Sequence, residues 1–214
     1  MTPLEYKTYL EDTPKYNTAQ EKNAMVKAID SESTPIDIAK ELGLNPTNES
    51  EAVAMIFQAR KKSVGEHIEV VSDCDCGFKN INQVLIDDLF FKNMEDIDKS
   101  VNIKLYDDIT EIEDFDDNEL ENINKIEKII MNNNNLIFSN IINITCKRCG
   151  NNYKIKINYK DIISKFTVKN IFEQYIDIST ITNMTKMDID SMIPFEREIF
   201  ISIIEEKQKK QQTQ

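Results

Sequence analysis

The sequence predicts an α+β protein, with two short β-hairpins in the middle of the chain and α-helical regions on both sides of them. Apolar residues recur at helical spacing before residue 63 and again after residue 165, whereas short segments between these limits alternate apolar and polar residues, as strands do. Two cysteine pairs lie among the strand-like segments, and a glycine directly follows each pair. The 214 residues are enough for one domain of ordinary size or two small ones.

The N-terminal helical region is expected to span residues 1–66. Its second helix is well marked, because Ser33-Thr34-Pro35 places a cap before a proline at the first helical position and Gly43 ends the helix. The second and third helices superficially resemble a helix-turn-helix. Acidic residues open the third helix, however, and would face phosphate in a complex with DNA, so a pair of core helices is the favoured interpretation. The three helices are predicted at 21–29, 36–42 and 47–62.

The β part is expected to span residues 67–165 and to be split into 67–90 and 138–165. Both halves have the same order along the chain: a strand, a cysteine pair, a glycine and a second strand. Residues 91–137 are an insertion of mixed structure, whose segment 107–121 holds nine acidic residues and no basic one. This acidic segment indicates a solvated face, with repulsion of wrong partners or docking of a basic partner as the alternative. The strands are predicted at 67–71, 80–86, 141–145 and 153–157.

A C-terminal helical region is expected over residues 166–206, followed by a frayed polar tail over 207–214. After Pro194 the apolar residues repeat at helical spacing and form one face of a helix. This face has two interpretations: it docks in a groove of a partner protein, or it completes the core of the chain itself. The candidate partner-binding residues on it are Phe195, Ile199, Phe200 and Ile203.

The two cysteine pairs predict a structural zinc site. The candidate ligands are Cys74 and Cys76 in the first half and Cys146 and Cys149 in the second. Four thiolates hold Zn²⁺ as a tetrahedron, and a following glycine at positive φ lets backbone N–H groups point at the sulfur atoms. Two hairpins joined in this way form a zinc ribbon. Because four thiolates leave no open coordination position, we expect about one structural zinc ion per chain and no catalytic one.

Two other interpretations of the cysteines stay open. The first pair is one residue shorter than the second, so an alignment of the two glycines would match Asp73 with Cys146 and give a site of three cysteines and one aspartate. A redox dithiol would need thiols that titrate below neutral pH, which Lys147 and Arg148 would favour. Strands rather than a helix N-terminus flank the pairs, which argues against the redox interpretation.

Composition excludes several other classes of function. The chain has only four glycines and no glycine-rich phosphate loop, and the single histidine, His67, leaves little material for a catalytic triad. No apolar run is long enough to span a bilayer, and the N-terminus has no basic start or apolar stretch of a signal peptide. The net charge of -12 argues against a broad nucleic-acid interface. We therefore expect no enzymatic activity, no membrane contact and a reducing, cytoplasmic location.

Two stretches of the sequence resemble a known family. In residues 56–77 a helix ends with Arg60 and is followed by Ser63-Val64-Gly65-Glu66, a strand and the first cysteine pair. This order resembles the baseplate hub assembly proteins of T-even-type contractile-tailed phages, best over residues 56–89. The sequence MIPFEREIF at 192–200 is similar to a short helical element of small hub-assembly proteins of such phages. Together these resemblances cover about half of the chain.

The resemblance implies a non-enzymatic late protein that acts in virion assembly, either as a baseplate hub subunit or as a tail assembly chaperone. Its expected partners are other phage baseplate hub proteins and the tape-measure protein. Its expected location is the cytoplasm of the infected host and, if it is retained, the virion tail baseplate. The alternative is a phage transcription or replication accessory factor whose zinc ribbon binds nucleic acid or a polymerase.

Overall fold

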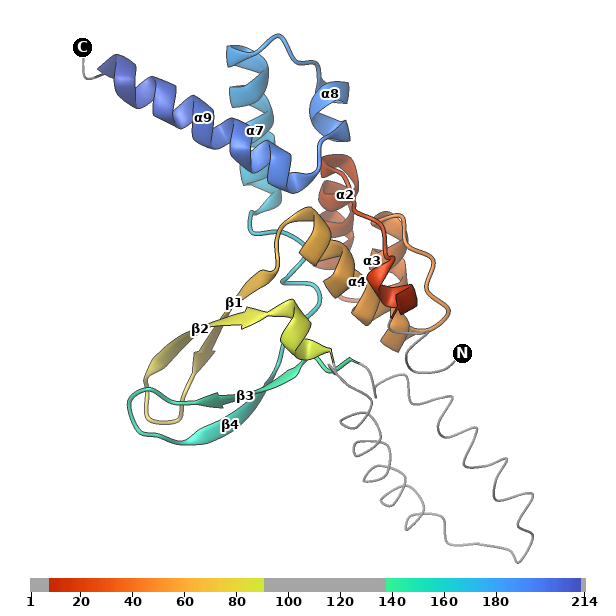
Figure 1. The fold of residues 1–214 in the computed structure, drawn as a ribbon, viewed down its shortest axis with the longest axis vertical. Helices are drawn as coiled ribbons and strands as arrows, with labels where there is room; N and C mark the ends of the chain where they lie inside the picture. Colours follow the sequence, from red (N-terminus) through yellow and green to blue (C-terminus); the bar gives the residue numbers. More distant parts are fainter. Residues whose placement is uncertain (1–7, 91–137, 213–214) are drawn as a thin grey trace, which may run out of the picture.

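The computed structural model describes residues 8–90 and 138–212, and it has the α+β architecture expected from the sequence (Figure 1). The helices from the two ends of the chain lie next to each other, and the two β-hairpins project together from one side of them. The predictions for the insertion over 91–137 lie outside the described residues. Within the described ranges, no helix is long and apolar enough to cross a lipid bilayer.

The helix before the first hairpin, α4 (Glu49–Ser63), belongs to the core. Ten of its fifteen residues are buried, which agrees with the expected pair of core helices and leaves no free face for a recognition helix. The two helices directly before it are shorter, α2 (Thr18–Ile29) and α3 (Pro35–Glu41). Each helix starts where a side chain accepts a hydrogen bond from a backbone N–H in the first turn. The capping residues are Asn17, Thr34 and Asn48.

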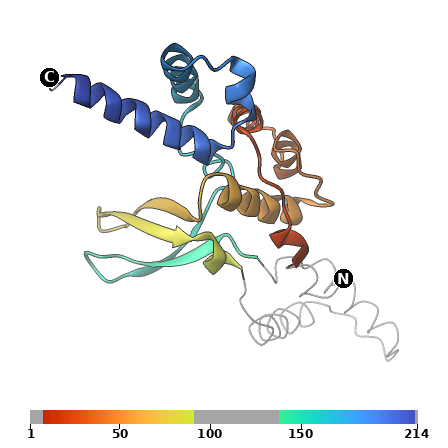
Figure 2. The ribbon, with the colours of Figure 1, turned by 45° about the horizontal axis from the view of Figure 1, so that its top comes forward.

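Two antiparallel hairpins form two separate two-stranded sheets. β1 (His67–Asp73) pairs with β2 (Lys79–Leu85), and β3 (Ile141–Thr145) pairs with β4 (Asn152–Lys156). All four strands agree with the prediction within two residues at each end. The hairpins lie one against the other with their turns at the same end of the molecule (Figure 2).

The N-terminal helices and both hairpins share one hydrophobic core. Phe57 of α4 lies against Phe138, with ring centroids 4.9 Å apart, and Phe138 lies 4.7 Å from Phe90. Phe90 and Phe138 also form an antiparallel bridge, just after the short 3-10 helix η1 (Ile86–Leu89). Phe90 and Phe138, which end the first described range and begin the second, therefore lie side by side in this core.

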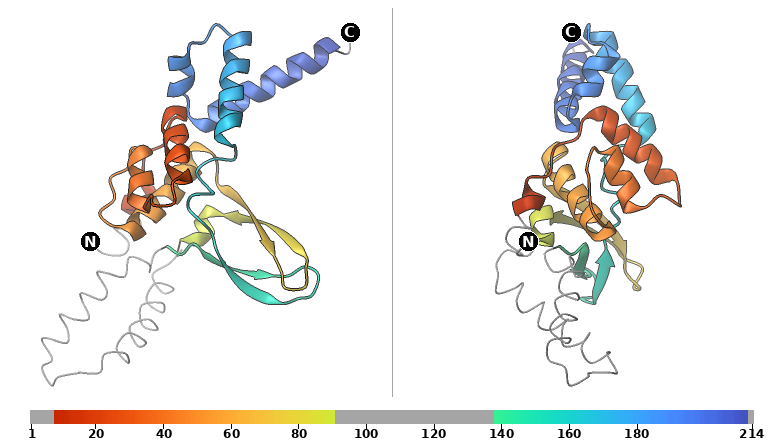
Figure 3. Two further views of the ribbon diagram at one scale, coloured as in Figure 1. Left: turned by 180° about the vertical axis from the view of Figure 1, so that it is seen from behind. Right: turned by 90° about the vertical axis from the view of Figure 1, so that its right-hand side faces the viewer.

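The C-terminal region forms a second hydrophobic cluster from α7 (Val168–Ile181), α8 (Lys186–Ser191) and α9 (Pro194–Gln212). A buried ion pair joins it to the N-terminal helices, because Arg197 Nη1 of α9 lies 2.6 Å from Glu21 Oε2 of α2. From this junction α9 extends away from the other helices (Figure 3). The expected boundary at 66–67 falls between α4 and β1, and the one at 165–166 falls between β4 and α7. The division of the chain into three regions stays a prediction.

The polar end of the chain differs from the expectation. The segment expected to be a tail from residue 207 continues α9 as a helix up to Gln212, whereas its fraying stays a prediction. Glutamate, lysine and glutamine have high helix propensity, and adding residues to an existing helix is far easier than nucleating one. The packed first turns of α9 supply that nucleus.

Candidate metal centre

The two cysteine pairs lie in the turns of the two hairpins. The backbone N–H of Gly77 donates to the carbonyl of Cys74 at 2.8 Å, and the N–H of Gly150 donates to the carbonyl of Cys146 at 2.9 Å. Both glycines have a positive φ, 77° and 75°, in the left-handed region that favours glycine. The glycines therefore close the turns in the way that the sequence predicts.

The four cysteine sulfur atoms form one cluster. Cys74 Sγ lies 3.6 Å from Cys149 Sγ, and Cys76 Sγ lies 3.7 Å from Cys146 Sγ, so each close pair joins the two hairpins. All four sulfur atoms lie within 4.8 Å of one another. The cysteines are free thiols, since a disulfide would hold two sulfur atoms about 2.05 Å apart.

A metal ion with four sulfur ligands fits this cluster. A regular tetrahedron with metal–sulfur bonds of about 2.3 Å has edges of about 3.8 Å. The two closest cross-hairpin separations, 3.6 and 3.7 Å, are near this value. Cys74 and Cys146 are buried, Cys76 is half-buried and Cys149 is exposed, so the cluster opens to solvent on one side. The structure thus brings all four predicted ligands together in a candidate metal site.

Asp73 lies outside this cluster. The backbone N–H of Cys74 donates to the carbonyl of Phe78 at 2.9 Å, and in the same way the N–H of Cys146 donates to the carbonyl of Asn151 at 2.8 Å. Cys74 and Cys146 therefore occupy equivalent positions at the start of their turns. The first turn is shorter between its cysteines, and Asp73 remains an exposed end residue of β1. This geometry favours four cysteines over three cysteines and one aspartate.

The local environment separates the pKa values of the thiols. Desolvation raises the pKa of Cys146, but hydrogen bonds from backbone N–H groups of its own turn and from the Asn80 side chain outweigh this effect and lower the pKa to about 6. A backbone hydrogen bond from Cys76 lowers the pKa of Cys74, but desolvation and hydrogen bonds with the neighbouring thiols outweigh it and raise the pKa. The surroundings therefore favour the thiolate form of Cys146 over that of Cys74. A cation bound by all four sulfur atoms would displace the remaining protons.

The lowered pKa of Cys146 meets one requirement of a redox dithiol. Cys146 is only 2% exposed, however, so an external disulfide has little access to its thiolate. The most exposed thiol is Cys149. A backbone hydrogen bond from Asn151 lowers its pKa, but desolvation and hydrogen bonds with Cys146 and Cys76 outweigh this effect and raise the pKa. The exposed thiol is thus the less reactive one, and the geometry favours metal ligation.

A buried polar network joins the two hairpins beside the cysteines. Asn80 of β2 is fully buried; its Nδ2 donates to the Tyr153 hydroxyl of β4 at 2.9 Å, and its Oδ1 accepts from the backbone N–H of Lys147 at 3.0 Å. The Tyr153 hydroxyl also lies 3.0 Å from Ser72 Oγ of β1. These bonds fix the second turn against the first hairpin and so orient the cysteines.

The sequence did not reveal this network. Its one local signal is Asn80 itself, an asparagine at an inward position of a strand, where an apolar residue is usual. A buried amide needs hydrogen-bond partners, so such a residue indicates a polar contact across the fold. The identity of that partner depends on how the two hairpins dock, which the local pattern does not specify.

The candidate partner-binding residues divide between surface and core. Phe195, Ile199 and Ile203 are 52%, 43% and 45% exposed and form an apolar stripe along α9, called the α9 stripe below. Phe200 instead packs against the C-terminal hydrophobic cluster. The two interpretations of this helix therefore apply to different residues: one face completes the core, and another is free in the described part of the chain.

Comparisons of the chain with protein-family models, with curated proteins and with solved structures find no match. The fold and the metal centre define an α+β protein with a four-cysteine candidate metal site.

Proposed function

We propose that Cys74, Cys76, Cys146 and Cys149 hold one structural Zn²⁺ ion and form a zinc ribbon. The observation that carries this proposal is the meeting of four sulfur atoms from two hairpins within 4.8 Å. Thiolates are soft ligands that suit zinc far better than magnesium or calcium. Four of them fill the coordination of zinc, so the ion stabilises the fold and has no open position for catalysis.

We further propose that the chain is a non-enzymatic phage tail protein that acts in baseplate hub assembly through protein contacts. The stretches that resemble hub assembly proteins lie where secondary-structure elements are connected or packed together. Arg60 Nη1 donates to the carbonyl of Gly65, within the turn that leads from α4 to β1. In the MIPFEREIF stretch, Arg197 is fully buried, whereas Phe195 and Ile199 are exposed. The same stretch thus both anchors α9 and presents an apolar surface, as an assembly protein requires.

The α9 stripe supports contact with other hub proteins or the tape-measure protein. Three large apolar side chains one helical turn apart on a single face are the usual anchors for an amphipathic partner segment. With such partners, we expect the protein in the cytoplasm of the infected host during assembly. Mass spectrometry of purified virions distinguishes a retained hub subunit from a chaperone that leaves.

The experiment that tests this role is co-expression of the full chain with the hub proteins and tape-measure protein encoded in the same phage genome. Co-purification with one of them is expected. The triple variant Phe195→Ser, Ile199→Ser and Ile203→Ser should reduce the amount of co-purified partner at least about tenfold, as is typical when a cluster of hot-spot residues is removed from an interface. Ile29→Ser, at a residue 77% exposed on α2, is the matched control and should retain the partner. Failure of every tail protein to co-purify would contradict the hub assignment.

A second candidate function rests on the charge of the second hairpin. Residues 138–158 contain four basic residues and no acidic one, and all four basic residues are exposed. This surface suits a transcription or replication accessory factor that binds nucleic acid or a polymerase. Retention of DNA at about 0.15 M salt, with affinity that falls as salt rises, would favour this candidate over the hub. The basic residues are Lys147, Arg148, Lys154 and Lys156.

A further inference from the structure

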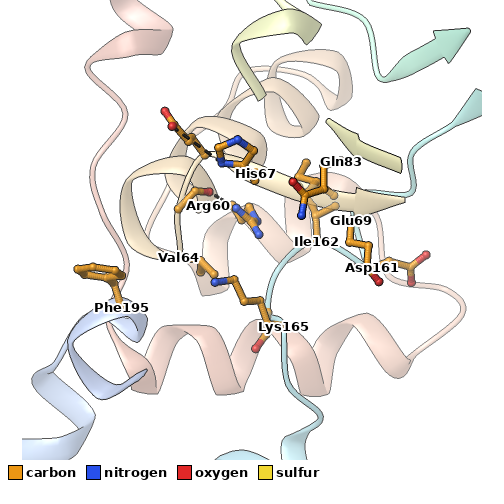
Figure 4. A pocket seen from close by; sticks show the side chains of 13 residues that line it. Arg60, Val64, His67, Glu69, Gln83, Asp161, Ile162, Lys165 and Phe195 are labelled. Carbon is orange, nitrogen blue, oxygen red and sulfur yellow. Dashed lines mark hydrogen bonds and ion pairs between the residues drawn. The ribbon is translucent and has the colours of Figure 1, made fainter. Parts of the chain in front are cut away.

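A pocket of about 750 Å³ lies where the turn between α4 and β1, the segment after β4 and the start of α9 meet (Figure 4). Arg60 lines it and is only 4% exposed. Val64, Ile162 and Phe195 contribute apolar surface to the lining. This pocket, called the Arg60 pocket below, is separate from the cysteine cluster, since no cysteine lines it.

The Arg60 guanidinium is not fully satisfied within the described part of the chain. Its Nη1 donates to the carbonyl of Gly65, but its buried Nε has no hydrogen-bond partner. No carboxylate among the described residues forms an ion pair with it. A buried guanidinium with an unpaired N–H is unfavourable, because burial removes water from the cation and the bond to Gly65 replaces only part of the lost solvation. The pocket beside Arg60 is therefore a favourable place for a negatively charged group.

A second cation, Lys165, and the apolar side chain of Phe195 also line the Arg60 pocket. In Figure 4 the Arg60 guanidinium and the Lys165 amino group extend toward the same part of the pocket, with Phe195 at its edge. Lys165 Nζ lies 3.2 Å from Glu198 Oε2, and that ion pair is partly exposed. Phe195 also begins the α9 stripe, so the Arg60 pocket is continuous with the apolar surface of α9.

We propose that the Arg60 pocket binds an acidic side chain carried by an apolar segment of a partner protein. The partner's carboxylate accepts hydrogen bonds from the Arg60 guanidinium and from Lys165, while its apolar neighbours pack on Phe195 and the rest of the α9 stripe. Free inorganic anions are poorer ligands for two reasons: they have no apolar group to pack on Phe195, and the exposed carboxylates of Glu66, Glu69 and Asp161 repel a multiply charged ion more strongly than they repel a single carboxylate. This inference rests on the protein-contact role proposed above, but not on the baseplate assignment.

The test is an NMR titration of the full ¹⁵N-labelled chain that follows the Nε–H resonance of Arg60, assigned with Arg60→Lys. The probe is acetyl-glutamyl-phenylalanine amide, and its matched neutral control is acetyl-glutaminyl-phenylalanine amide, each added to about 20 mM since a fragment of this size binds in the millimolar range. The glutamyl peptide should shift the Arg60 resonance and bind at least about tenfold more tightly than the glutaminyl peptide. Inorganic phosphate should bind more weakly than the glutamyl peptide.

Two variants separate a binding role from a structural one. Lys165→Gln should weaken the glutamyl peptide about threefold, whereas Lys169→Gln, at an exposed lysine of α7 that does not line the pocket, should leave its affinity unchanged. Equal shifts with both peptides, no shift at the highest concentration, or phosphate binding as tight as the peptide would overturn the proposal.

Glu198 is the internal competitor for Arg60. Its buried Oε1 has no hydrogen-bond partner among the described residues. Desolvation lowers the pKa of Arg60, and interactions with Tyr16 and then with the charge of Glu198 raise it. Glu198→Gln should leave the Arg60 Nε–H resonance in place and retain peptide binding. A large shift of that resonance in Glu198→Gln without any peptide would show that Glu198 is the partner, and the proposal would be wrong. Because no tail protein enters this titration, its failure leaves the co-purification test of the hub role unaffected.

Discussion

Asn80 and Tyr153 occupy equivalent positions in the two hairpins and are hydrogen-bonded to each other, with Asn80 Nδ2 donating to the Tyr153 hydroxyl at 2.9 Å. Each is the second residue of the strand that leaves its cysteine turn. The contact therefore links the two sheets directly beside the sulfur cluster. Because the protein itself holds the turns together, a metal ion would enter a site whose ligands are already close to their final positions.

Tyr153→Phe should destabilise the protein by about 1–3 kcal/mol. The variant keeps the ring but removes the hydroxyl, so the buried Asn80 amide and the Ser72 hydroxyl both lose a partner. Urea denaturation followed by circular dichroism measures this loss. The matched control is Tyr159→Phe, at a half-buried tyrosine, for which a change within about 0.5 kcal/mol is expected. Equal losses in both variants would mean that the hydrogen bonds to Tyr153 contribute nothing specific.

Asn80→Ala should weaken metal binding about 10- to 100-fold, as is typical when a group that orients metal ligands is removed. The Asn80 side chain accepts a hydrogen bond from the backbone N–H of Lys147, directly after Cys146, and it also lowers the pKa of that cysteine. Competition with a chromogenic chelator measures the affinity. Gln83→Ala, at an exposed position of the same strand, should bind metal as the unaltered chain does. Unchanged affinity in Asn80→Ala would remove Asn80 from the site.

Protein purified without chelator should contain about one zinc ion per chain, and the ligand set can be tested by two variants. Cys149→Ser removes a sulfur atom of the cluster and should reduce the zinc content to less than about a tenth, since incomplete thiolate sets bind zinc far more weakly. Asp73→Asn should retain the full content, because Asp73 is exposed and outside the cluster. Elemental analysis by mass spectrometry gives both numbers. Loss of zinc in Asp73→Asn would restore the site of three cysteines and one aspartate.

The sequence predicts those features that depend on local chemistry. The alternation of strands such as β4, the cap at Thr34 and the glycine after each cysteine pair are all properties of a few neighbouring residues, and the structure has each of them. The four metal-ligand candidates could be found for the same reason, because two similar motifs in one chain suggest a shared site.

Contacts between distant segments could not be predicted in this way. Asn80 and Tyr153 are 73 positions apart, and Glu21 and Arg197 are 176 positions apart, so their pairing depends on the docking of whole elements. The apolar residues of α9 show the same limit. Helical spacing places Phe195, Ile199 and Phe200 on one broad face, but only packing decides that Phe200 contacts the core while the other two stay exposed.

Acidification should loosen the N-termini of α3 and α8 before it unfolds the core. Hydrogen bonds from the backbone and side chain of Thr34 lower the pKa of Asp37 below its ordinary value of 3.8, and those from Thr185 do the same for Asp188. A carboxylate whose pKa is lower in the folded state stabilises that state above the unfolded value, and the stabilisation is lost as pH falls through the folded pKa. Hydrogen exchange of the first-turn amides between about pH 2 and 5 should show this loss.

Asp188→Asn is the variant that checks the acid effect. It should remove most of the pH dependence at the start of α8, because an amide does not titrate, and leave that of α3 unchanged. Asp177→Asn, in the middle of α7, is the control and should alter neither helix start. A pH dependence of α8 that persists in Asp188→Asn would assign it to another group.

The ion pair between Arg197 and Glu21 is buried, with side chains that are 0% and 1% exposed. Arg197 also donates from Nε to Gln174 Oε1 at 2.7 Å, so one side chain connects α9 to both α2 and α7. Arg197→Met should destabilise the protein by about 3–5 kcal/mol, because the Glu21 carboxylate stays buried without a counter-charge. In Arg197→Met, limited proteolysis should cleave the C-terminal helices first, because the ion pair that holds α9 against α2 is lost.

The double variant Glu21→Met with Arg197→Met separates the cost of an unpaired charge from the value of the pair. Apolar side chains of similar size remove the unpaired carboxylate, so the double variant should recover most of the stability that Arg197→Met loses. Lys169→Met, which breaks the exposed Lys169–Glu173 pair at 3.5 Å, should cost less than about 0.5 kcal/mol. A double variant less stable than Arg197→Met alone would contradict this prediction, because removal of the Glu21 carboxylate would then cost stability even where it has no counter-charge. Comparison of the double variant with the unaltered chain gives the net contribution of the buried pair.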